Sequence, residues 1–281
     1  MQPGRYARLT EDVPFKKAFA TEDDKELLIT LLNIFLAKKL ALPIKDVFIK
    51  NPYIPGKTKF NRDAILDIHC VDEAGSKFIV EMQVNPQKHF FKRAIFYLSL
   101  SVANSGKKIK NWDFNFPNTY SLSFLDFDPD FGKKCYDIVQ YFSLHNDDHP
   151  EIKCDYIRFA FVILPRFKKS LEECKSLQDK LIFSLCHAHE FKKKPPELNG
   201  RFFDRLFHIA EISNLLPMEY DEYISRFMAR NDRYAQMEYA KEKGLEAGVL
   251  KVAKNMLAKG FSVASIVKAT NLSREQVKAL G

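Results

Sequence analysis

The feature that most constrains the fold is a carboxylate in the middle of an apolar run. Residues 64–71 read Ala-Ile-Leu-Asp-Ile-His-Cys-Val, and residues 77–84 read Lys-Phe-Ile-Val-Glu-Met-Gln-Val. A polar turn that contains glycine, residues 72–76, separates the two runs. Two apolar runs joined by such a turn predict a β-hairpin. An aspartate between leucine and isoleucine is unusual in such a strand, so Asp67 becomes a candidate functional residue.

The register of the hairpin decides which side chains meet. If Val71 pairs with Lys77 across the turn, Asp67 lies directly opposite Glu81. Side chains alternate along a strand, and paired residues share a face. One face then carries the apolar set, which is Leu66, Ile68, Cys70, Phe78, Val80, Met82 and Val84. The other face carries Asp67, His69, Lys77, Ile79, Glu81 and Gln83.

Paired carboxylates on one face indicate a metal site. Opposite side chains have Cβ atoms roughly 4.5–5.5 Å apart, and two carboxylates that close repel each other. A bound Mg²⁺ or Mn²⁺ removes this repulsion, because hard cations take carboxylate and water oxygens. The pattern therefore predicts a divalent-metal site at Asp67 and Glu81, with Gln83 beside it. The alternative is an exposed hairpin face that only carries polar residues.

The rest of the chain predicts an α+β protein with an α/β-like core, a mixed β-sheet flanked by helices and a helical C-terminal third. Helical periodicity covers residues 11–40, residues 86–103 and most of the chain from Ser170 onward. Strands are expected over residues 45–84, 119–126, 134–143 and 154–164. We expect a core at residues 1–170, a helical extension at 171–245 and a small helical appendix at 246–281.

Local signals mark the ends of helices near the C-terminus. A polar helical stretch at 229–248 is the expected soft boundary, and Gly260 is expected to end a helix. Ser262 can cap the next helix, and Ser273 with Gln276 three residues later forms a capping-box pattern.

Charge and cysteine content narrow the class of protein. The formal net charge of +8 favours polyanionic partners, through counterion release from phosphates. Most basic clusters also fit a solvated surface. Five cysteines without CxxC spacing argue against a disulfide framework and a structural zinc site, and they fit a reducing cytoplasm. No apolar stretch reaches the roughly 20 residues that a membrane span needs.

Other catalytic motifs are missing from the sequence. It contains no P-loop, no GxGxxG and no GxSxG. His69 is interpreted as structural or surface. The pairs His145/His149 and His187/His189 lack zinc spacing and are interpreted in the same way.

The hairpin resembles the core of PD-(D/E)XK nucleases. It is most similar to the PD-(D/E)XK nuclease family transposases, the recombination-promoting nucleases (Rpn). That family reads roughly LDI, a short turn and VEMQ, followed by a helix with an arginine and a tyrosine. The matching positions here are Leu66-Asp67-Ile68, Val80-Glu81-Met82-Gln83, and Arg93 with Tyr97, preceded by Phe91. Weaker likenesses are Asp12 to Lys16 with Phe19, the segment from Ile157 to Arg166, and the helical tail.

The resemblance implies a restriction-endonuclease-like fold and Mg²⁺-dependent (or Mn²⁺-dependent) hydrolysis of phosphodiester bonds in DNA. By carry-over, Asp67 and Glu81 bind the metal. Asp12, or Glu11 beside it, adds a third carboxylate unless it only caps the first helix. Gln83 is the third expected catalytic residue beside Asp67 and Glu81. It stands where the wider superfamily has lysine, and it can orient a water or contact phosphate by hydrogen bonds. The candidate phosphate-binding residues are Lys16, Arg62, Lys92 and Arg93.

Several functions stay open at this point. The leading hypothesis is a metal-dependent DNA endonuclease associated with transposition and recombination. The rivals are a catalytically inactive DNA-binding or assembly protein of the same fold and a nuclease that acts on RNA. The helices expected at 262–270 and 273–280 fit a helix-turn-helix DNA reader with Arg274, Gln276 and Lys278, or a packing or dimerisation appendage. DNA is the expected partner, no membrane is expected, and a homodimer is possible.

Overall fold

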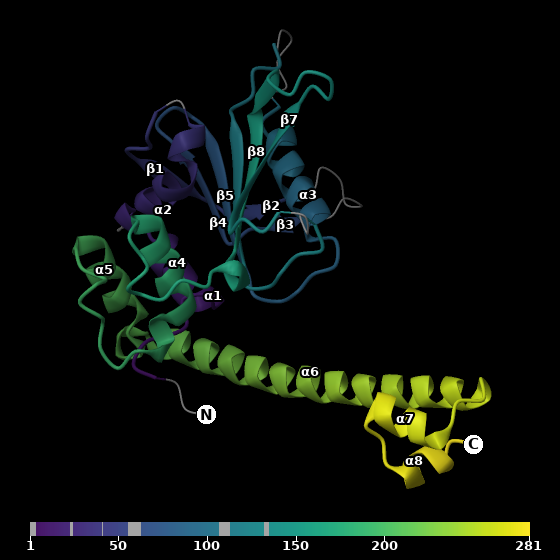
Figure 1. The fold of residues 1–281 in the computed structure, drawn as a ribbon. Helices are drawn as coiled ribbons and strands as arrows, with labels where there is room; N and C mark the ends of the chain where they lie inside the picture. Colours follow the sequence, from purple (N-terminus) through teal and green to yellow (C-terminus); the bar gives the residue numbers. More distant parts are fainter. Residues whose placement is uncertain (1–3, 23–24, 41, 56–62, 107–112, 132–134) are drawn as a thin grey trace. The chain divides into compact units, whose positions relative to one another are not determined.

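A six-stranded mixed sheet organises the larger part of the chain in the computed structural model (Figure 1). The structure describes all residues except 1–3, 23–24, 41, 56–62, 107–112 and 132–134. The strand order is β1-β4-β5-β6-β8-β7. The strands are β1 (Val47–Lys50), β4 (Ile68–Asp72), β5 (Lys77–Gln83), β6 (Thr119–Leu125), β7 (Val139–His145) and β8 (Lys153–Ile163).

Both parallel pairs lie in the middle of this sheet. Strand β6 runs parallel to β5 on one side and to β8 on the other, whereas the outer pairs are antiparallel. A separate two-stranded ladder joins β2 (Tyr53–Ile54) to β3 (Ala64–Ile65). Because β5, β6 and β8 point the same way, their carboxyl ends meet at one edge of the sheet.

Helices cover both faces of the sheet (Figure 1). One face packs against α1 (Asp12–Phe19), α2 (Glu26–Leu36), α4 (Leu177–His187) and α5 (Arg201–Ala210), and the other packs against α3 (Phe90–Ala103). Short 3₁₀ helices are η1 (Ala37–Lys39), η2 (Leu164–Arg166), η3 (Ala188–Glu190) and η4 (Ile212–Asn214). The predicted fold class, a mixed sheet flanked by helices, is confirmed.

The alternation of β5 explains why the sheet has two cores. Phe78, Val80 and Met82 belong to the large core beneath α1, α2, α4 and α5. Ile79 lies on the opposite side and packs with Leu98 of α3. A strand that is buried on both faces must be apolar at most positions, and β5 is buried from Phe78 to Gln83.

The hairpin has the predicted register, with Val71 opposite Lys77 and Ile68 opposite Val80. Asp67 precedes β4 and lies at a bend of the chain. Because the chain bends there, Leu66 leaves the alternation of the strand and packs with Ile79 beneath α3. The prediction that Leu66 shares the face of Ile68 is therefore wrong.

Some predicted boundaries also differ. The helix expected over residues 11–40 is two helices, since α1 ends at Phe19 and α2 begins at Glu26. The edge strand expected over residues 134–143 is β7, which begins at Val139. Its ladder with β8 starts there, with the pair Val139 and Val162.

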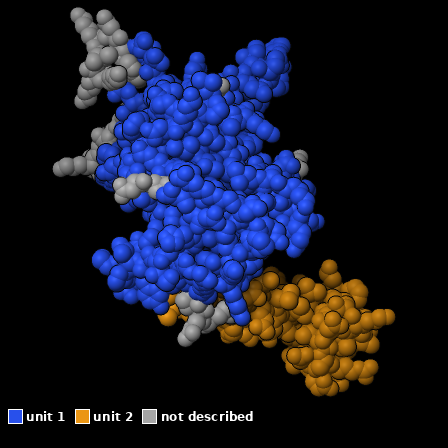
Figure 2. All heavy atoms as spheres, turned by 90° about the vertical axis from the view of Figure 1, so that its left-hand side faces the viewer, with its two compact units in different colours: residues 1–223 blue, residues 224–281 orange. Residues whose placement is uncertain are grey.

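The chain forms two compact units, residues 1–223 and residues 224–281 (Figure 2). The long helix α6 (Pro217–Ala258) runs without a break through the stretch predicted as a soft boundary. The second unit continues with α7 (Val263–Thr270) and α8 (Arg274–Lys278). The three-part division expected from the sequence stays a prediction.

The predicted end signals of the C-terminal helices are confirmed. Helix α6 ends at Ala258, and Gly260 follows with a φ of 80°, a left-handed conformation that glycine adopts readily. The Ser262 hydroxyl caps α7. Ser273 and Gln276 form the capping box of α8.

Among the helices formed by the described residues, none combines the length and the apolar character needed to cross a lipid bilayer.

Phe124 is expected to be a large contributor to stability. Its side chain is fully buried, and its ring lies 5.2 Å from Phe35 and 6.0 Å from Phe15, measured between centroids. Phe124→Ala should lower the free energy of unfolding by about 3–5 kcal/mol, because the cavity cannot close completely. Phe96→Ala is the control, since Phe96 is 41% exposed. Denaturant titration of both variants measures the difference, and equal losses would contradict this description of the core.

Candidate active site

The two hairpin carboxylates are held against each other at the end of β5. The Asp67 amide N–H donates to Glu81 Oε1 at 3.2 Å. In return, the Met82 amide N–H donates to Asp67 Oδ2 at 2.7 Å. These reciprocal bonds replace the ladder that the bend at Asp67 interrupts, and they bring the two acidic side chains together.

Helix α3 covers the carboxylate face of the hairpin. Glu81 is 4% exposed and Gln83 is 9% exposed, whereas Asp67 is partly open to solvent. An exposed hairpin face decorated with polar residues is therefore the wrong description. Because burying an ionised carboxylate is costly without partners, the residues around Glu81 must supply them.

Gln83 and Arg93 supply partners for Glu81. The Gln83 amide group donates to Glu81 Oε2 at 3.1 Å. Arg93 of α3 donates to Gln83 Oε1 at 3.1 Å, and its other terminal nitrogen lies 3.4 Å from Glu81 Oε2. Gln87, just before α3, accepts from Arg93 at 2.6 Å and donates to Gln83 Oε1 at 3.2 Å. The result is a closed network of one carboxylate, two amides and one guanidinium.

Helix α1 brings a third carboxylate and a cation to the same place. Lys16 Nζ lies 2.8 Å from Asp12 Oδ1 and 3.8 Å from Asp67 Oδ1. The ammonium group therefore lies between the two carboxylates. Asp12 is the first residue of α1, and Glu11 before it makes no side-chain cap bond. Glu11 is itself buried.

Burial and neighbouring negative charges raise the pKa values of both carboxyl groups. Burial, followed by the charge of Asp67, raises the pKa of Glu81 to about 8, although Arg93 and Gln83 act in the opposite sense. Burial also raises the pKa of Asp67, and the charge of Asp12 adds to that effect, whereas the Met82 N–H and Lys16 oppose it. Such a pair holds less than its full negative charge at neutral pH unless a cation joins it.

The remaining candidates fall in different places. Lys92 is exposed on α3, away from this network, and Arg62 lies outside the described residues. Tyr97, which is partly buried, packs in the core beneath α3, and the Arg93 guanidinium carbon lies 4.9 Å from its ring centroid. His69 is half-buried, with Nδ1 3.4 Å from the Asn51 carbonyl oxygen, and burial lowers its pKa. Its burial and its contact with the Asn51 backbone are those of a structural residue.

Sequence reasoning missed Gln87 and two serines of β6. Ser121 and Ser123 are buried on the side of the sheet that faces α3, and Ser123 is the register partner of Glu81. Together with Glu81 and Arg93 they line a cavity of about 10 Å³, room for roughly one water molecule. The available signal was a hydroxyl at alternate positions of an otherwise apolar strand, Thr119 to Leu125.

The carboxylate oxygens of this cluster are of the kind that a divalent cation prefers, but the described side chains are not arranged as a metal site. Across the described residues, no group of three or more His, Cys, Asp or Glu side chains is arranged to hold a metal ion. Asp12, Asp67 and Glu81 nevertheless supply hard carboxylate oxygens on adjoining elements, as Mg²⁺ prefers. The Lys16 ammonium lies where Asp12 and Asp67 attract positive charge.

Sequence comparison places the chain in a known family. The chain belongs to the PD-(D/E)XK nuclease family transposases, whose family profile matches residues 9–240. Residues 246–281 match a second profile, the C-terminal HTH domain of the Rpn/YhgA-like nuclease family. Comparison with curated proteins and with solved structures gives no match. The resemblance inferred from the hairpin is confirmed.

Glu81 should make the stability of the metal-free protein fall as pH rises. Its carboxyl group binds a proton in the folded state up to about pH 8, whereas the ordinary value is 4.5. Between these values the folded state holds more protons than the unfolded state, so the free energy of unfolding decreases with pH. The slope should reach about 1 kcal/mol per pH unit. Urea titrations at several pH values in EDTA measure it.

Two variants separate this effect from other titrations. Glu81→Gln should flatten the slope, because the amide does not ionise. Glu73→Gln should leave it unchanged, because backbone hydrogen bonds lower the pKa of Glu73 from its ordinary value, so that this group is ionised in both states over most of this pH range. Equal slopes in the wild type and in Glu81→Gln would show that another group carries the pH dependence.

Proposed function

We propose that this protein is a divalent-metal-dependent endonuclease that hydrolyses phosphodiester bonds in DNA. The observation that carries the proposal is the pair of the buried Glu81 and the partly open Asp67, which two backbone N–H groups hold together and charged groups from α1 and α3 flank. The membership of the nuclease family and the net charge of +8 support it. Like charges held this close need a cation to be stable in their ionised forms.

In this proposal Asp67 and Glu81 hold the metal, and Asp12 is the third carboxylate. A divalent cation bound there would polarise the phosphate and lower the pKa of the attacking water. Lys16 would then give up its place between Asp12 and Asp67. Its side chain is 39% exposed, so the released ammonium group can turn toward solvent and contact a substrate phosphate.

Gln83 and Arg93 together fulfil the role expected of the superfamily lysine. The Gln83 side chain accepts from Arg93 and donates to Glu81, which a lysine could not do because it only donates. A lysine at this position would also face the Arg93 guanidinium, and the like charges would repel each other. Gln83 therefore positions Glu81, and Arg93 brings the positive charge from α3 to the reacting phosphate.

The test is cleavage of supercoiled plasmid by purified protein in Mg²⁺, in Mn²⁺ and in EDTA. The wild type should nick or linearise the plasmid with either metal and not in EDTA. Asp67→Asn and Glu81→Gln should each lower the rate at least about 100-fold, because each removes a charged metal ligand. Glu73→Gln should cleave like the wild type, since it makes the same chemical change at an exposed site.

The other outcomes have defined meanings. Cleavage by Asp67→Asn or Glu81→Gln at the wild-type rate would overturn the assignment of the site. Binding of DNA without cleavage under any metal would favour the catalytically inactive member of the same fold. Addition of RNA as a competitor separates the two polymers, since an RNA-directed enzyme would lose plasmid cleavage at low RNA concentrations.

The second unit is proposed to bind DNA. Residues 246–281 match an HTH domain, and Ala253, Ile266 and Val277 form its core. The Gln276 side chain accepts from the Ser273 backbone N–H in the capping box, so its oxygen is already used. Arg274 and Lys278 of α8 are exposed and are the better candidates for contacts with DNA.

Replacing both cations of α8 should weaken DNA binding and its dependence on salt. Each phosphate contact adds about 0.9 to the slope of log affinity against log salt, so Arg274→Ala/Lys278→Ala should reduce the slope by about 2. The matched control is Lys251→Ala/Lys254→Ala, which removes the same charge from exposed positions of α6. Fluorescence anisotropy at several salt concentrations measures both. Equal slopes in the two variants would place the contacts elsewhere.

A further inference from the structure

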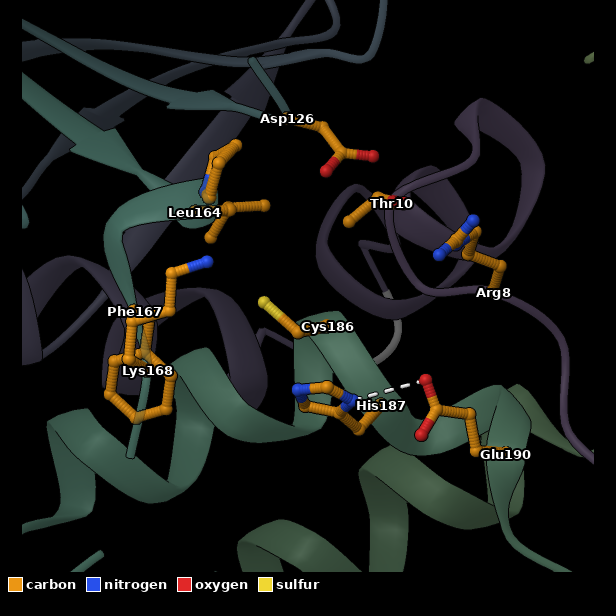
Figure 3. Close-up of a pocket in the computed structure, with 10 residues that line it drawn as sticks. Arg8, Thr10, Asp126, Leu164, Phe167, Lys168, Cys186, His187 and Glu190 are labelled. Carbon is orange, nitrogen blue, oxygen red and sulfur yellow. Dashed lines mark hydrogen bonds and ion pairs between the residues drawn. The ribbon is translucent and has the colours of Figure 1, made fainter. Parts of the chain in front are cut away.

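A second cavity lies at the edge of the sheet where β5, β6 and β8 end. Its volume is about 250 Å³ (Figure 3). Five chain segments form its wall: the segment before α1, the residue after β6, the turn after β8, the end of α4, and η3. The lining side chains that matter most are those of Arg8, Thr10, Asp126, Lys168, Cys186 and His187.

This cavity adjoins the carboxylate cluster. The Asp126 backbone N–H donates to the Gln83 carbonyl oxygen at 2.9 Å, so one wall of the cavity is hydrogen-bonded to a site residue. Thr10 stands two residues before Asp12. Ligands of sheets with parallel strands bind outside the carboxyl ends of those strands, which is the edge described here. The cavity and the carboxylate cluster therefore share the edge of the sheet at which these strands end.

Two cations of the wall have no counter-ion among the residues that the structure describes. Among the described residues, neither the Arg8 guanidinium nor the Lys168 ammonium has an ion-pair or hydrogen-bond partner. The neighbouring Lys169, in contrast, pairs with Asp179 at 2.9 Å. In Figure 3 the Lys168 amine and the Cys186 sulfur point toward the middle of the cavity. Unpaired cations at the wall of a concave site favour an anionic ligand.

The wall also offers a group for hydrogen bonding to a ligand, the hydroxyl of Thr10. Thr10 is 2% exposed, and its buried hydroxyl has no hydrogen-bond partner within the described part of the chain. Burial raises the pKa of Cys186 to about 12, so its thiol is neutral and does not compete for the cations. His187 is paired with Glu190 at 3.1 Å. A ligand therefore meets two cations, a hydroxyl, the Asp126 carboxylate and the His187–Glu190 pair.

We propose that this cavity receives one nucleotide of the DNA strand beside the scissile phosphate, an inference that rests on the proposed function. Arg8 and Lys168 hold the phosphate of that nucleotide, and Thr10 and Asp126 take hydrogen bonds from its base or sugar. A bare anion fits less well, because the Asp126 carboxylate faces the same space. A nucleotide carries both a phosphate for the two cations and polar groups on its base and sugar that can bond to the Thr10 hydroxyl.

The experiment measures binding and cleavage on the same proteins. The full chain in EDTA is titrated with a 5′-deoxynucleoside monophosphate, with inorganic phosphate and with a short single-stranded oligonucleotide, by calorimetry. The variants are Arg8→Gln and Lys168→Gln, and Lys169→Gln is the matched control. We expect millimolar binding of the mononucleotide to the wild type and to Lys169→Gln, with Kd about tenfold higher for Arg8→Gln and Lys168→Gln. Circular dichroism verifies that each variant is folded.

Cleavage adds the second readout. Lys168→Gln should raise KM for plasmid about tenfold, whereas Lys169→Gln should not change it. Three results would overturn the inference: equal Kd values for Lys168→Gln and Lys169→Gln, phosphate binding as tightly as the mononucleotide, or no competition between mononucleotide and oligonucleotide.

Failure of the proposed function gives a different pattern. In that case no protein cleaves DNA, although nucleotide and oligonucleotide still compete and binding still depends on Lys168. If the wild type cleaves normally and Lys168→Gln matches it in both KM and Kd, the endonuclease assignment stands and the nucleotide cavity is rejected.

Discussion

The structure depends on two acidic side chains held together across the hairpin, of which Glu81 is buried and Asp67 is partly open to solvent. Asp67 and Glu81 would repel each other if nothing compensated them. Two backbone N–H groups, one amide and one guanidinium provide the compensation. The cover of α3 and the approach of α1 both serve this cluster, because one brings Arg93 and the other brings Lys16. A fold selected only for stability would have used apolar residues at these positions.

Much of the fold and part of the site could be predicted from the sequence, because these features depend on local patterns. The hairpin register follows from the turn and from strict alternation, and the capping box follows from Ser273 and Gln276. The bend at Asp67 could not be predicted, since alternation assumes a regular strand. The cover of the carboxylate face by α3 is a tertiary contact that no pattern within the hairpin encodes.

The residues that sequence reasoning missed share one property. Gln87 and Ser123 are ordinary polar residues when they are considered alone, and only their neighbours make them part of the site. The reverse holds for Lys92, which is adjacent to Arg93 in sequence yet exposed on α3, away from the network. Along a helix, adjacent residues point about 100° apart, so a basic pair rarely serves one site.

The network around Gln83 has a direction. Arg93 donates to the oxygen of the Gln83 amide, and the nitrogen of the same amide donates to Glu81. Rotating the amide by half a turn would set its N–H₂ group against the guanidinium and its oxygen against the carboxylate, so both contacts would become repulsive. Only one orientation of the Gln83 amide is therefore stable while Glu81 is ionised. Through this amide the charge state of Glu81 on β5 affects Arg93 on α3. Hydrogen bonds aligned in this way polarise one another, so a change at either end is felt at the other.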